Sequence, residues 1–146
     1  MNRKEVSEII GLSADTLRYY ERIGVIPPIK RDKNGYRAYR PNDLNWLFLT
    51  KCLRNAGLSI EALIEFSKLN QQGENEPAQK AILEDQLEVL NQKMAEMKRT
   101  RDLLQHKIDT FEDHTAKFKT GEMDVDHVEE LWKMPEFQEP EENRKN

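Results

Sequence analysis

Two short clusters of arginine and tyrosine have the chemistry needed to bind nucleic acid. The first is Arg18-Tyr19-Tyr20, and the second is Tyr36-Arg37-Ala38-Tyr39, with Lys30 shortly before it. Arginine can form forked hydrogen bonds with a guanine edge or a phosphate, and tyrosine can donate to phosphates while its ring packs on sugars. The alternatives are a helix whose tyrosines lie in a core, and a solvated hairpin. The two clusters together favour DNA binding.

Cys52 is the single cysteine, so the chain predicts neither an intrachain disulfide nor a cysteine-rich metal site. Lys51 and Arg54 are near it in sequence and could stabilise a thiolate, although neighbours one and two positions away do not share its helix face. An electrophile that alkylated a partly buried thiol would overpack a helix interface. The alternative is a small, inert core residue. The sequence leaves both readings open.

The remaining chemistry-bearing residues give no sign of an enzyme. His106, His114 and His127 are far apart in sequence, and we expect them to be solvated or to lie at helix ends. A cysteine enzyme would need a partner for its thiol, and no histidine is near Cys52 in sequence. We therefore expect no catalytic site, no metal and no cofactor.

Charge divides the chain into two unlike parts. The net charge is −4 at pH 7, but residues 1–59 carry +5 and residues 60–146 carry −9. A basic front part joined to an acidic rear part is typical of a phosphate-binding module attached to one that stays off DNA. The opening residues lack the apolar run of a signal peptide, and no stretch has the roughly 18 apolar residues of a membrane span. We expect a soluble, cytoplasmic protein.

A helix-turn-helix is expected to hold the first cluster, over residues 3–22. Apolar residues recur at helical spacing up to Gly11, which is a natural helix stop. Ser13 is then a candidate N-cap for a helix over 14–22. Ser13 and Thr16, at the start of this second helix, are further candidate DNA contacts.

A two-stranded wing is expected to hold the second cluster, over residues 27–41. Pro27-Pro28 forbids further helix. Asn34-Gly35 favours a tight primed turn, because both residues tolerate positive φ. Pro41 is expected to end the wing.

Two further helices are predicted over residues 42–56 and 59–70, with Asn42 or Asp43 capping the first and Ser59 the second. They would complete a DNA-binding domain over 1–70. The first should bury one apolar face, made of Leu44, Leu47, Phe48, Cys52 and Leu53. A polar linker, residues 71–77, follows.

A long dimerisation helix is predicted over residues 78–113, which contain neither glycine nor proline. One seam repeats at alternating spacings of four and three residues over about four heptads, as in a coiled coil. Its members are Leu83, Leu87, Leu90, Met94, Met97, Arg101, Leu104, Ile108 and Phe111. Arg101 interrupts the apolar seam and would help to fix register and orientation.

The tail, residues 114–146, gives weaker signals. Residues 124–132 could form a short helix, and residues 136–146 have a composition typical of disorder. Trp132, Met134 and Phe137 are expected to pack back on the long helix or on the partner's DNA-binding domain rather than to form a ligand cage.

The stretch from Thr16 to Pro27, TLRYYERIGVIP, and the later GYRAY, residues 35–39, resemble the MerR family of bacterial transcription regulators. The resemblance extends to about residue 112. It implies a mainly α fold, in which a winged helix-turn-helix domain is followed by an antiparallel coiled-coil helix that joins a homodimer. It also implies that the dimer binds a promoter palindrome and distorts the spacer DNA so that RNA polymerase can use it.

The resemblance also assigns roles to residues. Arg18 would read bases and phosphates, and Tyr19 and Tyr20 would contact the backbone. Arg54 resembles the position that touches phosphates near the operator centre. The wing contacts would be Tyr36, Arg37 and Tyr39.

The effector is less defined. Metal-sensing relatives have cysteines at the start of the long helix and after it, and this chain has none there. Drug-sensing relatives carry a large ligand domain, whereas only 34 residues follow Glu112. A lone cysteine at position 52 resembles the branch that responds to thiol and aldehyde stress, so a small electrophile is one candidate. A response to another small molecule or to an efflux substrate, with a purely structural Cys52, stays open. So does a coiled-coil interaction protein whose winged module binds protein.

Overall fold

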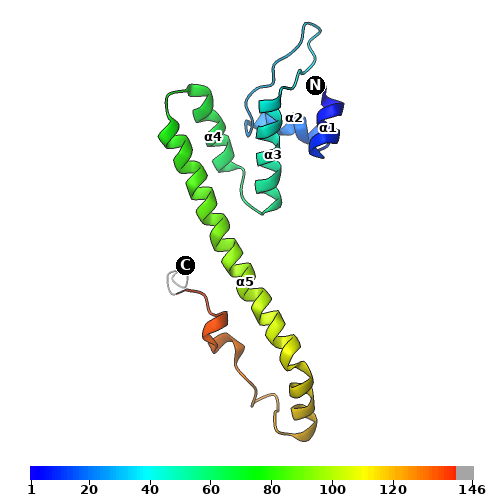
Figure 1. The fold of residues 1–146 in the computed structure, drawn as a ribbon, viewed down its shortest axis with the longest axis vertical. Helices are drawn as coiled ribbons and strands as arrows, with labels where there is room; N and C mark the ends of the chain where they lie inside the picture. The colour runs from blue at the N-terminus through cyan, green and yellow to red at the C-terminus, as the bar shows by residue number, and fades with distance from the viewer. Residues whose placement is uncertain (141–146) are drawn as a thin grey trace. The chain divides into compact units, whose positions relative to one another are not determined.

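The computed structural model describes residues 1–140 of the chain, which divides into two compact units. The first is Met1–Leu90 and the second begins at Asn91. The structure is mainly helical, as predicted, and the long helix α5 (Glu76–Thr120) contributes to both units (Figure 1). The predicted domain division at residues 1–70, 78–113 and 114–146 stays a prediction.

The first two helices, α1 (Arg3–Ile10) and α2 (Ala14–Ile23), are closed by local caps that the sequence encodes. The Ser13 hydroxyl accepts a hydrogen bond from the Thr16 amide at 3.1 Å, which is the predicted N-cap of α2. Gly11 ends α1 at a φ of 76°, where a residue with a side chain would be strained. The two helices therefore form the expected helix-turn-helix.

The segment between α2 and α3 differs from the predicted two-stranded wing. One isolated bridge, Arg31 with Arg37, stands where strands were expected. Gly35 has a φ of 84°, but Asn34 does not adopt positive φ, so the predicted primed turn is wrong. Instead, the Asp32 carboxylate accepts hydrogen bonds from two backbone amides, Asn34 at 2.8 Å and Tyr36 at 3.0 Å. We call this loop, residues 27–40, the wing.

Helix α3 (Pro41–Asn55) begins one residue earlier than predicted, because Pro41 occupies its first turn rather than ending the wing. The predicted cap was also wrong. Asp43 lies in the first turn and accepts a hydrogen bond from the Arg40 amide at 2.8 Å. The buried face of α3 includes Trp46 and Leu47.

The predicted buried face of α3 was partly wrong. Phe48 is 59% exposed and Cys52 is exposed. Trp46, absent from the predicted set, packs on Phe66 with ring centroids 5.0 Å apart. The face of α3 that meets the core therefore includes Trp46 and Leu47 but not Phe48, which residue spacing alone had favoured.

Helix α4 (Glu61–Gln72) follows α3 and is preceded by Ile60, not by the predicted Ser59 cap. The segment from Gly73 to Asn75 connects it to α5, and α4 lies beside the first turns of α5 (Figure 1). The core of the first unit draws on α1, α2, the wing, α3 and α4. Its fully buried side chains include Val6, Leu17, Val25, Ile26, Leu47 and Leu63.

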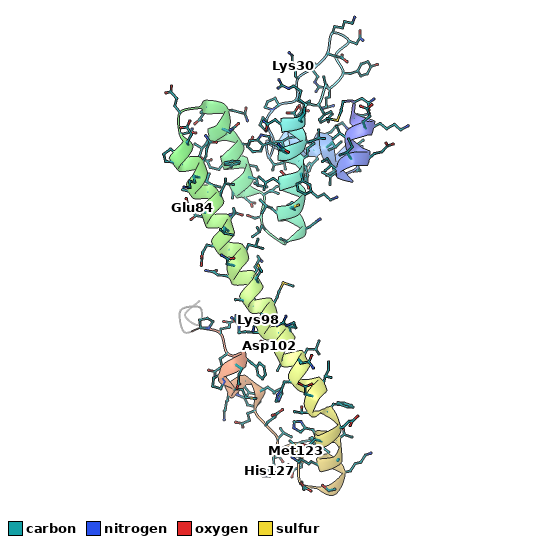
Figure 2. The ribbon with its side chains drawn as sticks, viewed as in Figure 1. Lys30, Glu84, Lys98, Asp102, Met123 and His127 are labelled. Atoms are coloured by element: carbon teal, nitrogen blue, oxygen red, sulfur yellow. The ribbon has the colours of Figure 1, made fainter. Side chains whose placement is uncertain are left out.

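The predicted seam lies along α5, which buries no residue within this single chain. Seam side chains such as Leu87, Met97 and Leu104 are 57%, 72% and 62% exposed. The helix continues past the predicted end at 113, as far as Thr120, and Gly121 ends it at a φ of 82°. Lys98 and Asp102 form an ion pair of 2.9 Å, one turn apart on this helix (Figure 2).

In the second unit, the segment after α5 turns at Met123 to His127 and runs back along the helix (Figures 1 and 2). It contains two single-turn 3-10 helices, η1 (Leu131–Lys133) and η2 (Pro135–Phe137). The short helix expected over 124–132 is therefore absent, and Asp124 pairs with His127 in an isolated bridge instead. Disorder was predicted for 136–146; residues 136 and 137 lie in η2, and 141–146 lie outside the described residues.

Candidate nucleic-acid interface

Arg18 and Tyr19 are exposed on α2, as a DNA-reading helix requires. The Arg18 guanidinium pairs with the Asp15 carboxylate one turn earlier. The Arg22 guanidinium lies over the Tyr19 ring, 5.3 Å from its centroid. Because both pairs lie at the surface, they orient Arg18 and Tyr19 without removing them from solvent.

Ser13 and Thr16 lie at the N-terminal end of the same helix. The Ser13 hydroxyl donates to the Thr16 hydroxyl at 2.9 Å while accepting from the Thr16 amide. Their polar atoms are thus used in capping, and they hold the start of α2 beside Arg18. A helix N-terminus also favours anions such as phosphate.

Tyr20 and Tyr39, both expected at the DNA surface, lie in the core instead, with exposed fractions of 8% and 3%. The alternative of core tyrosines therefore describes these two residues. The Tyr39 hydroxyl is buried without a hydrogen-bond partner, and burial raises the pKa of this phenol. Their rings are part of the hydrophobic core of the first unit.

Lys30 and Tyr36 are exposed on the wing, and Tyr36 is 72% exposed at its tip. Figure 2 shows Lys30 on this loop. Arg37 differs from them, because its guanidinium Nε donates to the Glu21 carboxylate at 2.6 Å and its side chain is only 19% exposed. Of the predicted contacts on the wing, Lys30 and Tyr36 are thus exposed, whereas Arg37 faces α2.

A cleft of about 630 Å³ separates the wing from α1. Arg3 and Lys4 line it from α1, and Arg31 and Tyr36 line it from the wing. Sequence reasoning missed Arg3, Lys4 and Arg31 as candidate contacts. The basic charge of residues 1–59 was the available signal, but only the folded chain places these cations around one cleft.

Cys52 and Arg54 lie on α3, and both are exposed. The Lys51 ammonium donates to the Ile10 carbonyl oxygen at 2.6 Å, and an Arg54 guanidinium nitrogen lies 3.5 Å from the Leu58 carbonyl oxygen. Both cations next to Cys52 in sequence therefore contact backbone carbonyls. Because the Cys52 thiol is exposed, the prediction of a partly buried thiol is wrong. The alternative prediction, a cysteine in the core, is wrong for the same reason.

His106 and His114 contact one carboxylate, an arrangement that sequence separation hid. Glu129 Oε1 lies 2.7 Å from His106 Nε2 and 3.8 Å from His114 Nδ1. The Phe137 ring centroid is 5.6 Å from that of His106, so Phe137 packs back on α5 as expected. Trp132 does not, since it is 70% exposed.

The part of the chain that the structure describes contains neither a candidate metal site nor a candidate membrane-spanning helix. Among residues 1–140, no three histidine, cysteine or acidic side chains gather closely enough to hold a metal ion. Over the same residues, no helix combines the length and apolar character of a bilayer span.

Comparison with known families gives two overlapping matches, which together cover residues 1–107. Residues 1–68 match the model of the MerR HTH family regulatory proteins, and residues 44–107 match the model described as MerR, DNA binding. A solved MerR family transcriptional regulator from Listeria monocytogenes is 41% identical and superposes with a TM-score of 0.75. The alignment covers 88% of this chain and 99% of that one.

The chain belongs to the MerR family.

Two relatives of this MerR-family chain indicate which branch of the family it resembles. The regulator AdhR of Bacillus subtilis is 52% identical over 87 residues, which are 59% of this chain and 62% of AdhR. The match thus spans less than two thirds of AdhR. HiNmlR, solved as a MerR family regulator lacking the sensor domain and bound to promoter DNA, is 33% identical with a TM-score of 0.69. That alignment covers 79% of this chain and 92% of HiNmlR.

These similarities support the NmlR/AdhR-like branch that the lone cysteine suggested. The MerR-family chain is a DNA-binding transcriptional regulator, and its relatives are named as regulators rather than enzymes.

Proposed function

We propose that this MerR-family regulator binds a promoter palindrome as a homodimer, distorts the spacer between the polymerase recognition elements, and responds to a small electrophile through Cys52. The observation that carries the DNA part is the joint exposure of Arg18 and Tyr19 on α2 and of Tyr36 on the wing. A regulator of this kind acts where the promoter is, which favours the cytoplasm, and RNA polymerase is its expected partner.

Three groups of residues are proposed to contact DNA. Arg18 reads base edges, Tyr19 contacts the backbone, and the capped end of α2 with Ser13 and Thr16 faces a phosphate. The wing and the cleft beside it supply further phosphate contacts through Arg3, Lys4, Lys30, Arg31 and Tyr36. Arg54 on α3 is proposed to contact a phosphate near the operator centre. Tyr20 and Tyr39 support these contacts from the core.

The homodimer is supported by the seam on α5. All of its apolar members except the half-buried Leu90 are exposed in a single chain. An apolar heptad seam of this length is stable in water when a partner helix covers it. An antiparallel partner helix would hold two DNA-binding domains apart at a distance set by the seam. That separation is what a palindrome with two half-sites needs.

The electrophile response is supported by the accessibility of Cys52 and by similarity to the NmlR/AdhR-like branch. Addition to an aldehyde forms a bond between Sγ and the carbonyl carbon, breaks the carbonyl π bond and places the thiol proton on oxygen, giving a hemithioacetal. This adduct adds bulk on the face of α3 that also presents Phe48. Bulk on an exposed face acts by changing what that face contacts rather than by overpacking a core.

The DNA proposal is tested with the palindrome upstream of the chain's own coding sequence. The affinity for this duplex should exceed that for a scrambled duplex, and it should fall steeply with salt because phosphate contacts release counterions. A chain that bound the two duplexes equally would act as a nonspecific binder. One that bound neither would instead favour the interaction protein whose winged module binds protein.

The electrophile proposal is tested by the Cys52→Ser variant in a promoter-reporter assay. Wild-type output should rise on challenge with an aldehyde, and the variant should lose that response while keeping its affinity for the palindrome. Thr110→Ser, a conservative change on α5, serves as the matched control. An unchanged response in Cys52→Ser would favour the second candidate, in which another small molecule or an efflux substrate is the inducer.

A further inference from the structure

Glu21 joins the DNA-reading helix to both limbs of the wing. Its carboxylate lies on α2, and the side chain is only 13% exposed. Oε2 accepts a hydrogen bond from the Ile29 amide at 2.7 Å. Oε1 accepts one from Arg37 Nε at 2.6 Å and lies 3.8 Å from a guanidinium nitrogen of Arg31. One carboxylate therefore contacts the wing where it leaves α2 and where it returns.

Two other hydrogen bonds of the wing connect its limbs to each other. The Ala38 amide donates to the Lys30 carbonyl oxygen, and the Asp32 amide donates to the Tyr36 carbonyl oxygen, both at 2.8 Å. These bonds fix the shape of the loop but not its position relative to α2. The contacts of Glu21 bind the wing directly to α2, one helical turn after Arg18. Tyr39 and Arg40 bind the returning end of the wing to Met1 and to Asp43 instead.

The charge of Glu21 also needs an explanation, because a carboxylate on a DNA-reading helix repels phosphates. Here it is shielded by two wing guanidinium groups and turned away from solvent. A mostly buried carboxylate that accepts from a guanidinium and a backbone amide makes strong, directional bonds. Such bonds are suited to holding a loop against a helix.

We propose that Glu21 is a positioning residue for DNA binding: it holds the wing at the distance from α2 at which Tyr36 and Arg18 engage the same duplex. Arg37 then acts through Glu21 rather than by contacting DNA. This inference rests on the proposed DNA contacts of Arg18 and Tyr36.

The test uses the full chain and the Glu21→Gln variant. Glutamine keeps an oxygen for the Ile29 amide but loses the charge that holds Arg37. We expect affinity for the palindrome to fall at least about tenfold, the loss expected for one charge-assisted hydrogen bond. Glu65→Gln removes the same charge from an exposed position on α4 and should leave affinity unchanged.

A double-mutant cycle separates positioning from a merely structural role. Tyr36→Ala should weaken binding in the wild-type background but change it by only about twofold or less in the Glu21→Gln background, because the wing is then already displaced. Independent, multiplicative losses would overturn the proposal, as would wild-type affinity in Glu21→Gln.

Folding is checked by circular dichroism and thermal unfolding of each variant. If Glu21→Gln does not fold, Arg37→Lys takes its place in the same cycle, since lysine keeps the charge but lacks the Nε donor. Coupling with Tyr36→Ala again supports the proposal, and independence again overturns it. Failure of the wild-type chain to bind the palindrome would instead remove the proposed DNA function, so the two failures are distinguishable.

Discussion

The ammonium group of Lys51 donates a hydrogen bond to the carbonyl oxygen of Ile10 across 2.6 Å, joining α3 to the C-terminal end of α1. A cation at this end of a helix stabilises carbonyl groups that have no partner within the helix. This single contact links residues that are 41 positions apart in sequence.

Replacing Lys51 with methionine should lower the free energy of unfolding by about 1–2 kcal/mol, because a part-buried carbonyl loses a charged donor. Urea unfolding at one fixed protein concentration measures the change. Lys68→Met alters an exposed lysine on α4 and should leave the unfolding midpoint nearly unchanged. Equal midpoints for Lys51→Met and wild type would mean that the contact adds nothing to stability.

Replacing Tyr39 with phenylalanine should preserve or raise stability by up to about 1 kcal/mol, since the buried hydroxyl has no hydrogen-bond partner. Affinity for the palindrome should stay the same, because the ring remains in the core. Thermal unfolding and a DNA titration measure the two effects. A large loss of affinity with a native Tm would show that the hydroxyl reaches DNA.

The same residue predicts a dependence on alkaline pH. Burial raises the pKa of Tyr39 above its ordinary value of 10.0, so the folded chain favours the neutral phenol. The stability that this gives is present below about pH 10 and is lost as pH rises through the raised pKa. Wild-type stability should therefore fall more steeply above pH 10 than that of Tyr39→Phe. Parallel curves for the two proteins would contradict this.

Replacing Glu129 with alanine should loosen the segment that runs back along α5, because His106 and His114 both contact this carboxylate. We expect trypsin to cut after Lys133 roughly 3–10 times faster, as a consequence of more frequent local opening. Limited proteolysis followed by mass spectrometry reports the site and the rate. Glu136→Ala, which removes an exposed carboxylate from the same segment, is the control.

Replacing Leu104 with glutamate places a charge in the α5 seam and should convert the proposed dimer to monomers at micromolar concentration, since a buried unpaired charge is costly. Sedimentation velocity measures the mass. Gln105→Glu adds the same charge next to the seam and should remain dimeric. A dimeric Leu104→Glu variant would place the interface on another face.

Helix positions were the most predictable part of the fold. Ser13 and Gly11 determine their helix ends by local bonds and local φ values, so a short stretch of sequence carries the information. The long helix α5 was equally predictable. Its end at Thr120 was not, because the apolar pattern weakens before the helix does.

Burial was harder to predict, because it depends on contacts between distant residues. Spacing on α3 favoured Phe48 and Cys52, but Trp46 reaches Phe66 on α4 and turns that face inward. In the wing, Asn34-Gly35 suggested a two-residue turn, yet the Asp32 carboxylate organises a longer loop.

Exposure was predicted correctly for some residues of the candidate interface and wrongly for others. Arg18, Tyr19 and Tyr36 are exposed as expected, whereas Tyr20 and Tyr39 share their residue type but lie in the core. Sequence alone cannot distinguish a surface tyrosine from a buried one in a stretch where the chain alternates between the two. The role of Glu21 was invisible for the same reason, since its partners are 8, 10 and 16 residues away.

The unburied seam of α5 also has a consequence for gene control. On the proposed pairing, assembly of two chains precedes occupation of a two-part operator, so at low abundance the occupied fraction grows with the square of the protein level. A cell would then obtain a threshold: halving the amount of regulator would lower promoter occupancy about fourfold in that range. The exposed leucines and methionines would thereby make the regulator a sensor of its own abundance.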